Sequence, residues 1–142
     1  MNWVVSNQQY LFVYGTLRLG TGTSWSQFLA SAATSIGLGR TRGVMFQLNG
    51  YPGMTHSASD SDWVTGEVFR LKDSTSAWPI LDEYEGCGPS GPLPHTFERK
   101  IVPIDMNDGG RLDAWAYFYC LDTAGRTRIQ SGDYLQSIHS SV

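Results

Sequence analysis

Short runs of apolar and aromatic residues, separated by glycine and by polar residues, recur along the chain. The runs are bounded by turn residues and rich in β-branched and aromatic side chains, a pattern typical of strands. The first run, YLFVY, is apolar or aromatic at every position and predicts a buried strand. Strands are predicted in this way over residues 10–14, 35–49, 63–71, 97–104 and 111–121.

Glycine, proline and clusters of polar residues predict the turns between these strands. Tyr51–Gly53 (YPG) predicts a tight turn, residues 57–62 (SASDSD) a polar loop, and residues 107–110 (NDGG) a hairpin turn. Gly66 lies inside a predicted strand, where glycine marks a bulge or a close approach of two backbones. The longest predicted loop is 87–96, which is rich in glycine and proline.

Two short helices interrupt the predicted strands, over residues 21–34 and 73–86. In the second helix Asp73, Ser74 and Ser76 are candidate N-caps, and Pro79 fits only in the first turn. This mixed order predicts an α+β fold, a small mixed β-barrel or roll with two short flanking helices. With 142 residues and no linker or internal repeat, the chain is predicted to be a single domain over 1–142.

Composition narrows the range of partners. The formal net charge is −3 and the ten Lys and Arg residues form no basic stripe, so nucleic acid is not an expected partner. Cys87, Cys120 and the three histidines lack ligand spacing, so neither a metal nor another cofactor is expected. No stretch resembles a signal peptide or a membrane span, which predicts a cytoplasmic protein with no membrane partner. The sequence leaves the oligomeric state open.

Glu85 is the acidic residue with the strongest indication of a chemical role. At helical spacing it falls near Leu81 and Trp78, at the edge of the apolar face of the second helix. It also lies at the helix C-terminus, where the helix dipole disfavours an anion, and near Asp82 and Glu83. Each of these effects raises a carboxyl pKa, which suits a general base. The alternative is an exposed terminal glutamate with no catalytic role.

The turn that follows the first strand is a second candidate site. Gly15 allows a close backbone approach, and the N–H groups of Gly15, Thr16 and Leu17 can hold an anion or a polarised carbonyl oxygen. The alternative is an ordinary glycine turn that ends a strand.

Short motifs occur in a fixed order along the chain: VYGTLR, YPG, GEVFRL, LDEYEG, AWAYFY and SGDY. An aromatic residue, Phe97, also stands two positions before Arg99. No single motif is decisive, but the ordered set resembles the gamma-glutamylcyclotransferase-like family. The resemblance extends from Leu11 to about Tyr134, nearly the whole chain.

The resemblance implies a small mixed β-barrel with flanking helices and an intramolecular reaction. Members of the family cleave a γ-glutamyl amide by attack of the substrate's own α-amine, which releases 5-oxoproline and an amine and needs no metal. The expected partner is therefore a small γ-glutamyl substrate. Matched onto this chain, the family's acid is Glu85, the expected general base. The matching substrate-binding positions are Tyr14, Gly15, Thr16, Leu17, Tyr51, Pro52 and, by a weaker match, Tyr117.

The chain departs from the family at Phe97, where tyrosine is common, and in the long loop 87–96. Both departures bear on the identity of the substrate more than on the reaction. Three other functions stay open. Two retain the pocket: release of a γ-glutamyl protecting group from a biosynthetic intermediate, and non-catalytic binding of a small molecule. The third is a structural or interaction protein, which would have no cavity beside Glu85. Glu85 favours an enzyme, because a site that only binds an anion would not place a carboxylate there.

Overall fold

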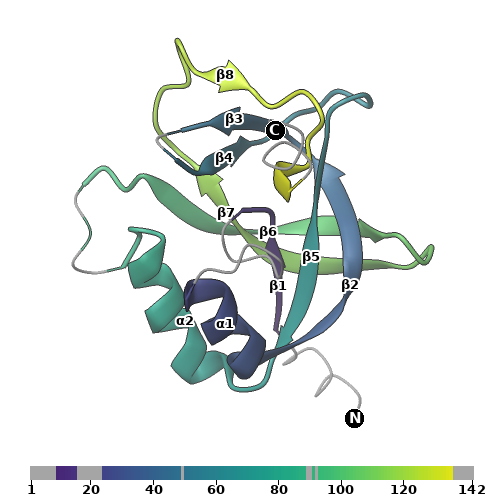
Figure 1. The fold of residues 1–142 in the computed structure, drawn as a ribbon, viewed down its shortest axis with the longest axis vertical. Helices are drawn as coiled ribbons and strands as arrows, with labels where there is room; N and C mark the ends of the chain where they lie inside the picture. The colour runs from purple at the N-terminus through teal and green to yellow at the C-terminus, as the bar shows by residue number, and fades with distance from the viewer. Residues whose placement is uncertain (1–8, 16–23, 49, 89–90, 92, 136–142) are drawn as a thin grey trace.

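Five strands close into a barrel (Figure 1). The computed structural model describes residues 9–15, 24–48, 50–88, 91 and 93–135, except for the side chains of Ser24 and Trp25. The barrel strands are β1 (Tyr10–Val13), β2 (Ala33–Arg42), β5 (Trp63–Leu71), β6 (Phe97–Met106) and β7 (Arg111–Tyr119). Their order around the barrel is β1-β5-β2-β6-β7. Neighbouring strands are antiparallel, except that β7 pairs in parallel with β1 and closes the barrel.

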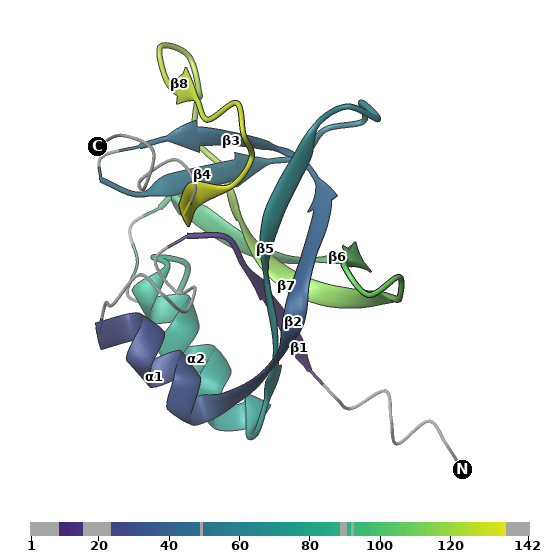
Figure 2. The same cartoon turned by 45° about the vertical axis from the view of Figure 1, so that its right-hand side comes forward.

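A second sheet of three strands contacts the barrel (Figures 1 and 2). It contains β3 (Val44–Gln47), β4 (Pro52–Thr55) and β8 (Thr127–Arg128), in the order β4-β3-β8. The glycine-punctuated strand region predicted over 35–49 is therefore divided between the two sheets. The chain leaves the barrel at Gly43, whose N–H donates to the carbonyl of Asp62, and it continues in the second sheet.

The tight turn predicted at Tyr51–Gly53 lies earlier in the chain. The N–H of Leu48 donates to the carbonyl of Tyr51 over 2.8 Å, so these two residues already pair across the connection between β3 and β4. Pro52 pairs with Gln47 and is the first residue of β4. An edge strand accepts a proline at its first position, because the missing N–H leaves no gap in a hydrogen-bond ladder.

The two helices, α1 (Ser24–Ala32) and α2 (Ser74–Tyr84), lie side by side on the outside of the barrel (Figures 1 and 2). Asp73, one of the three predicted candidates, is the N-cap of α2, and its side chain accepts from the N–H of Ser76. Pro79 lies inside α2, one turn beyond its predicted place. Its missing N–H leaves the carbonyl of Thr75 without the usual helical donor, and both residues are exposed to water. The predicted fold, a small mixed β-barrel with two short flanking helices, is confirmed.

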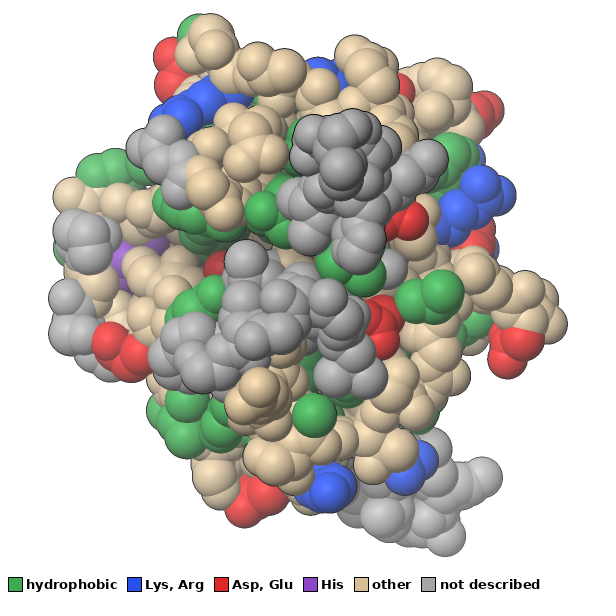
Figure 3. Space-filling view, viewed as in Figure 1, with side chains coloured by type: hydrophobic (Ala, Val, Ile, Leu, Met, Phe, Trp, Pro, Cys, Tyr) green, Lys and Arg blue, Asp and Glu red, His purple; other side chains and the backbone are tan. Residues whose placement is uncertain are grey.

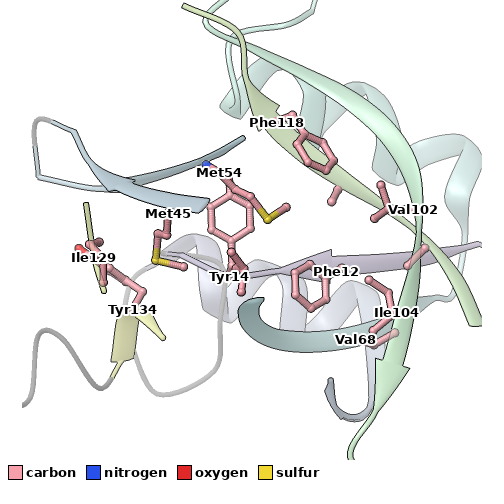
Figure 4. Close-up of a cluster of buried hydrophobic side chains, with 13 residues drawn as sticks. Phe12, Tyr14, Met45, Met54, Val68, Val102, Ile104, Phe118, Ile129 and Tyr134 are labelled. Atoms are coloured by element: carbon pink, nitrogen blue, oxygen red, sulfur yellow. Dashed lines mark hydrogen bonds between the residues drawn. The ribbon is translucent and has the colours of Figure 1, made fainter. Parts of the chain in front are cut away.

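Residues along β1 alternate between two hydrophobic clusters. Leu11 and Val13 pack with Leu81 of α2 in the cluster that joins the helices to the barrel. Phe12 and Tyr14 point the other way, into the cluster that fills the barrel and extends toward β3 and β4 (Figure 4). Because both faces of β1 are buried, its sequence is apolar or aromatic throughout rather than alternating with polar residues.

Gly66 marks a close approach of two backbones, one of the two alternatives predicted for it. A Cβ at this position would meet the carbonyl oxygen of Val13 and lie 2.7 Å from the ring of Phe12. The neighbouring irregularity in strand pairing falls in β2, between Ser35 and Gly37. The tight contact between β5 and β1 fixes the position of the end of β1, where the candidate site begins.

Candidate active site

A pocket of about 450 Å³ opens where the end of β1, the β3–β4 turn and the end of α2 meet. Hydrophobic side chains show as several separate groups on this face of the molecule, among polar and charged ones (Figure 3). Glu85 is the one acidic side chain among the described lining residues. The lining comprises residues 12–15 from β1 and its turn, 50–52 before and in β4, 84–86 at the end of α2, 96–97, and Tyr117.

Glu85 is the C-cap residue of α2, and the local structure fixes its direction. Its N–H donates to the carbonyl of Leu81 over 2.9 Å, so the backbone is still helical where the side chain enters the pocket wall. Burial, and secondarily the carboxylate of Asp82, raise the pKa of Glu85 from 4.5 to about 8. At pH 7 about a tenth of the molecules therefore carry an ionised Glu85.

The structure brings together most of the residues that the sequence singles out as substrate-binding. Gly15, Tyr51, Pro52 and Tyr117 line the same pocket as Glu85. Gly15 packs directly on Pro52, since a Cβ on Gly15 would lie 3.0 Å from the Cγ of that proline. Tyr51 is 38% exposed and forms part of the rim.

Two of the expected residues, Thr16 and Leu17, lie outside the described residues. The donor site expected from the N–H groups of residues 15–17 therefore stays a prediction.

Tyr14 also lines the pocket, but its hydroxyl is engaged inside the protein. It donates to the carbonyl of Tyr117 over 2.6 Å and accepts from the N–H of Met54 over 3.1 Å. Burial, reinforced by the charge of Glu85, raises the pKa of Tyr14 well above its usual value. Figure 4 shows the ring of Tyr14 between Met45 and Met54. A ligand in the pocket can thus meet the backbone or ring of Tyr14, while the hydroxyl links strands.

Asp82 is a part of the site that the sequence does not single out for a role of its own. Its carboxylate accepts two hydrogen bonds from Arg99, at 3.0 Å from Nε and 3.1 Å from an Nη atom. It also accepts the hydroxyl proton of Tyr117 over 2.7 Å. The sequence places Asp82 one helical turn after Trp78 and Arg99 on the same strand face as Phe97, but neither position indicates that the two residues pair.

The side of the pocket formed by residues 96–97 and Tyr51 is aromatic. The rings of Tyr51 and Phe97 lie 6.2 Å apart, and Phe97 packs edge-on against Tyr119 at 5.7 Å. Of the described residues of loop 87–96, Thr96 lines this pocket, whereas Cys87 and His95 line a separate depression.

The described residues include neither a metal-binding group nor a membrane-spanning helix. No group of three His, Cys, Asp or Glu side chains is arranged to hold a metal ion in this part of the chain. No helix among the same residues has the length and hydropathy needed to cross a membrane.

The fold and the pocket define a small α+β barrel protein whose aromatic cavity holds one carboxyl group of raised pKa. The sequence profile of the family described as gamma-glutamyl cyclotransferase, AIG2-like, matches residues 11–136. The chain belongs to this family and is an enzyme of the gamma-glutamylcyclotransferase type.

Known proteins similar to this chain include ones from archaea and bacteria. MJ1514 of Methanocaldococcus jannaschii, provisionally named a gamma-glutamylcyclotransferase, is 31% identical over 129 residues, which cover 89% of this chain and 95% of MJ1514. The crystal structure of YkqA from Bacillus subtilis is 26% identical with a TM-score of 0.67, covering 95% of this chain but only 43% of YkqA. The solution structure of ytfP from Escherichia coli is 26% identical with a TM-score of 0.61, covering 92% of this chain and 99% of ytfP.

Proposed function

We propose that this chain releases 5-oxoproline and an amine from a small γ-glutamyl amide, with Glu85 as the general base. The observation that carries the proposal is the position of Glu85, whose carboxyl has a raised pKa and lines an aromatic pocket beside Gly15 and Pro52. Family membership supports the reaction type. The reaction requires a γ-glutamyl group in the substrate and does not define the amine to which that group is attached.

The first step is removal of a proton from the substrate's α-ammonium group by the Glu85 carboxylate. An α-amino group has an ordinary pKa of about 8. The pKa of Glu85 is also about 8, so the two groups exchange a proton with little free-energy difference. An exposed glutamate with a pKa near 4.5 would be a much weaker base toward the same ammonium.

Ring closure follows within the substrate. The freed amine attacks the γ-carbonyl carbon, the new C–N bond closes the five-membered ring, and the carbonyl oxygen takes the negative charge. Well-oriented intramolecular attack contributes on the order of 7–11 kcal/mol to lowering a barrier. The N–H groups of residues 15–17 are proposed to hold either this oxygen or the substrate's α-carboxylate.

The tetrahedral intermediate then collapses by breaking the original amide bond. The carbonyl double bond re-forms, and the leaving nitrogen takes the proton that Glu85 received in the first step. It takes a second proton from the ring nitrogen, which carried two after the attack, so the amine departs as an ammonium ion. Glu85 returns to its ionised form, so protons balance over the cycle. The aromatic wall at Tyr51 and Phe97 offers a surface for the carbon skeleton of the leaving amine.

The test is incubation of the protein with a panel of γ-glutamyl amines and γ-glutamyl peptides, with 5-oxoproline measured by mass spectrometry. We expect 5-oxoproline and free amine in equal amounts from at least one member of the panel. The Glu85→Gln variant is the control for contaminating activity. Tight binding of γ-glutamyl compounds with no 5-oxoproline from any of them would instead support a non-catalytic binding domain.

A further inference from the structure

An ion pair stands directly behind the pocket. Asp82 and Arg99 face each other through two parallel hydrogen bonds, the bidentate geometry that is strongest for an arginine and a carboxylate. Their side chains are only 20% and 23% exposed, so water screens the pair weakly. Neither residue lines the pocket that contains Glu85.

Two tryptophans hold the guanidinium of Arg99 in place. Its central carbon lies 4.1 Å from the ring centroid of Trp78 on α2 and 5.0 Å from that of Trp115 on β7. The indole N–H of Trp115 in turn donates to the side chain of Gln9 over 3.0 Å. Arg99 is therefore fixed by planar contacts as well as by its carboxylate partner.

Asp82 is also the charged neighbour that acts on Glu85. Asp82 lies three residues before Glu85, at the end of α2. The negative charge of Asp82 adds to burial in raising the pKa of Glu85. The other titratable groups near Glu85 are Tyr14 directly after β1, Tyr117 on β7 and Cys87 after α2. Each of these three has a raised pKa, so each is neutral near pH 8. Among the described neighbours, the charge that Glu85 experiences thus comes from Asp82.

We propose that Asp82 and Arg99 are positioning residues: their ion pair fixes the hydroxyl of Tyr117 in the pocket wall, and its charge modulates the ionisation of the buried Glu85. Asp82 favours the protonated form of Glu85, and Arg99 limits that effect by offsetting the charge of Asp82. Removing either partner therefore moves the titration of Glu85, in opposite directions. The consequence for catalysis rests on the proposed function, but the effect on the titration does not.

The titration of Glu85 can be followed directly by ¹³C NMR of glutamate side-chain carboxyls. The chain contains four glutamates, Glu67, Glu83, Glu85 and Glu98, and the Glu85→Gln variant identifies the signal of interest. We expect Asp82→Asn to move its midpoint to lower pH, by about one pH unit. Arg99→Gln, which leaves Asp82 unpaired, should move the midpoint to higher pH.

The exposed pair of Arg42 and Asp60 provides a matched control. Its atoms approach to 2.6 Å, but the side chains are 47% and 87% exposed, and neither residue lines the pocket. Arg42→Gln should leave the midpoint of Glu85 unchanged. Arg99→Lys keeps the charge but loses the bidentate geometry, so its midpoint should fall between those of wild type and Arg99→Gln. This arginine series tests the proposal even if Asp82→Asn does not fold.

Kinetic measurements distinguish the ion-pair proposal from the proposed cyclotransferase function. If the chain is a cyclotransferase, the pH at which kcat rises should follow the NMR midpoint in each variant. Shifted midpoints with no 5-oxoproline from wild type would overturn the proposed function and leave the ion-pair proposal standing. Midpoints that stay at the wild-type value in folded Asp82→Asn and Arg99→Gln variants would overturn the proposal, whatever their activity.

Discussion

The hydroxyl of Tyr14 donates a 2.6 Å hydrogen bond to the main-chain carbonyl of Tyr117, 103 residues further along the chain. The same oxygen accepts the N–H of Met54. One buried side chain at the end of β1 thereby links the barrel strand β7 to β4 of the second sheet. Tyr14 and Tyr117 both line the pocket, so the shape of the pocket depends on hydrogen bonds within the protein that involve no ligand.

Replacing Tyr14 by Phe should destabilise the protein by about 1–3 kcal/mol, because a buried N–H and a buried carbonyl lose their partner. Urea unfolding monitored by tryptophan fluorescence measures the change. Tyr51→Phe, which removes the hydroxyl of a 38% exposed tyrosine, is the matched control and should have a much smaller effect. Equal stability of Tyr14→Phe and wild type would mean that the bond between β1 and β7 adds nothing net.

Replacing Gly15 by Ala should reduce activity while preserving the fold. The new methyl group would lie 3.0 and 3.1 Å from two carbons of Pro52, so one wall of the pocket must move by a few tenths of an ångström. Because Gly15 has no positive φ, the backbone itself accepts alanine. A fall in kcat/KM with an unchanged unfolding midpoint is the expected result, and Gly15→Val should show a larger fall.

Gly110→Ala is the control for that substitution. It lies in the β6–β7 hairpin turn, lines no part of the pocket, and also lacks a positive φ. Its kcat/KM should equal that of wild type. Wild-type activity in Gly15→Val would contradict a role for this turn in binding substrate.

The raised pKa of Glu85 predicts a pH dependence of stability. Unfolded Glu85 titrates near 4.5 and native Glu85 near 8, so between these values the native state binds more protons than the unfolded state. The contribution of this group to stability is therefore complete below pH 4.5 and is lost as the pH rises to 8. Glu85→Gln cannot titrate, so it should gain a few kcal/mol relative to wild type between pH 5 and pH 8.5.

Urea unfolding at several pH values checks this expectation. Glu98→Gln, on the exposed side of β6, is the matched control and should follow the wild-type pH dependence. A constant stability difference between Glu85→Gln and wild type would mean that the carboxyl of Glu85 titrates normally in the folded protein.

The sequence predicts those parts of the fold that local pattern determines. The strand predicted over 63–71 coincides with β5, and Asp73 is the N-cap of α2, because a bounded apolar run and a capping side chain are both local signals. The split of 35–49 between two sheets was not predictable in the same way. It depends on where the chain leaves the barrel, and strand propensity is similar on both sides of Gly43.

The same division applies to the candidate site. Helical spacing and the helix end single out Glu85, whose pKa is indeed raised, although burial contributes more than any neighbouring charge. The ion pair of Asp82 and Arg99 escapes sequence analysis because it joins α2 to β6 across 17 residues. Helical periodicity predicts which face of α2 a side chain occupies, but it does not predict which strand packs against that face. The inward direction of the Tyr14 hydroxyl is hidden for the same reason.

The most direct test of the central claim is the rate of 5-oxoproline release by Glu85→Gln, measured with the best substrate of the panel from pH 6 to pH 9. Gln keeps the size of the side chain but cannot take a proton from the substrate's ammonium. Wild-type kcat should rise with pH and level off above about 8, and Glu98→Gln should behave like wild type. Below pH 8, where the substrate's amine is mostly protonated, Glu85→Gln should be slower by about 10²- to 10⁴-fold with an unchanged fold, and the difference should narrow toward pH 9. Release of 5-oxoproline by Glu85→Gln at a rate near that of wild type would contradict the assignment of Glu85 as the general base.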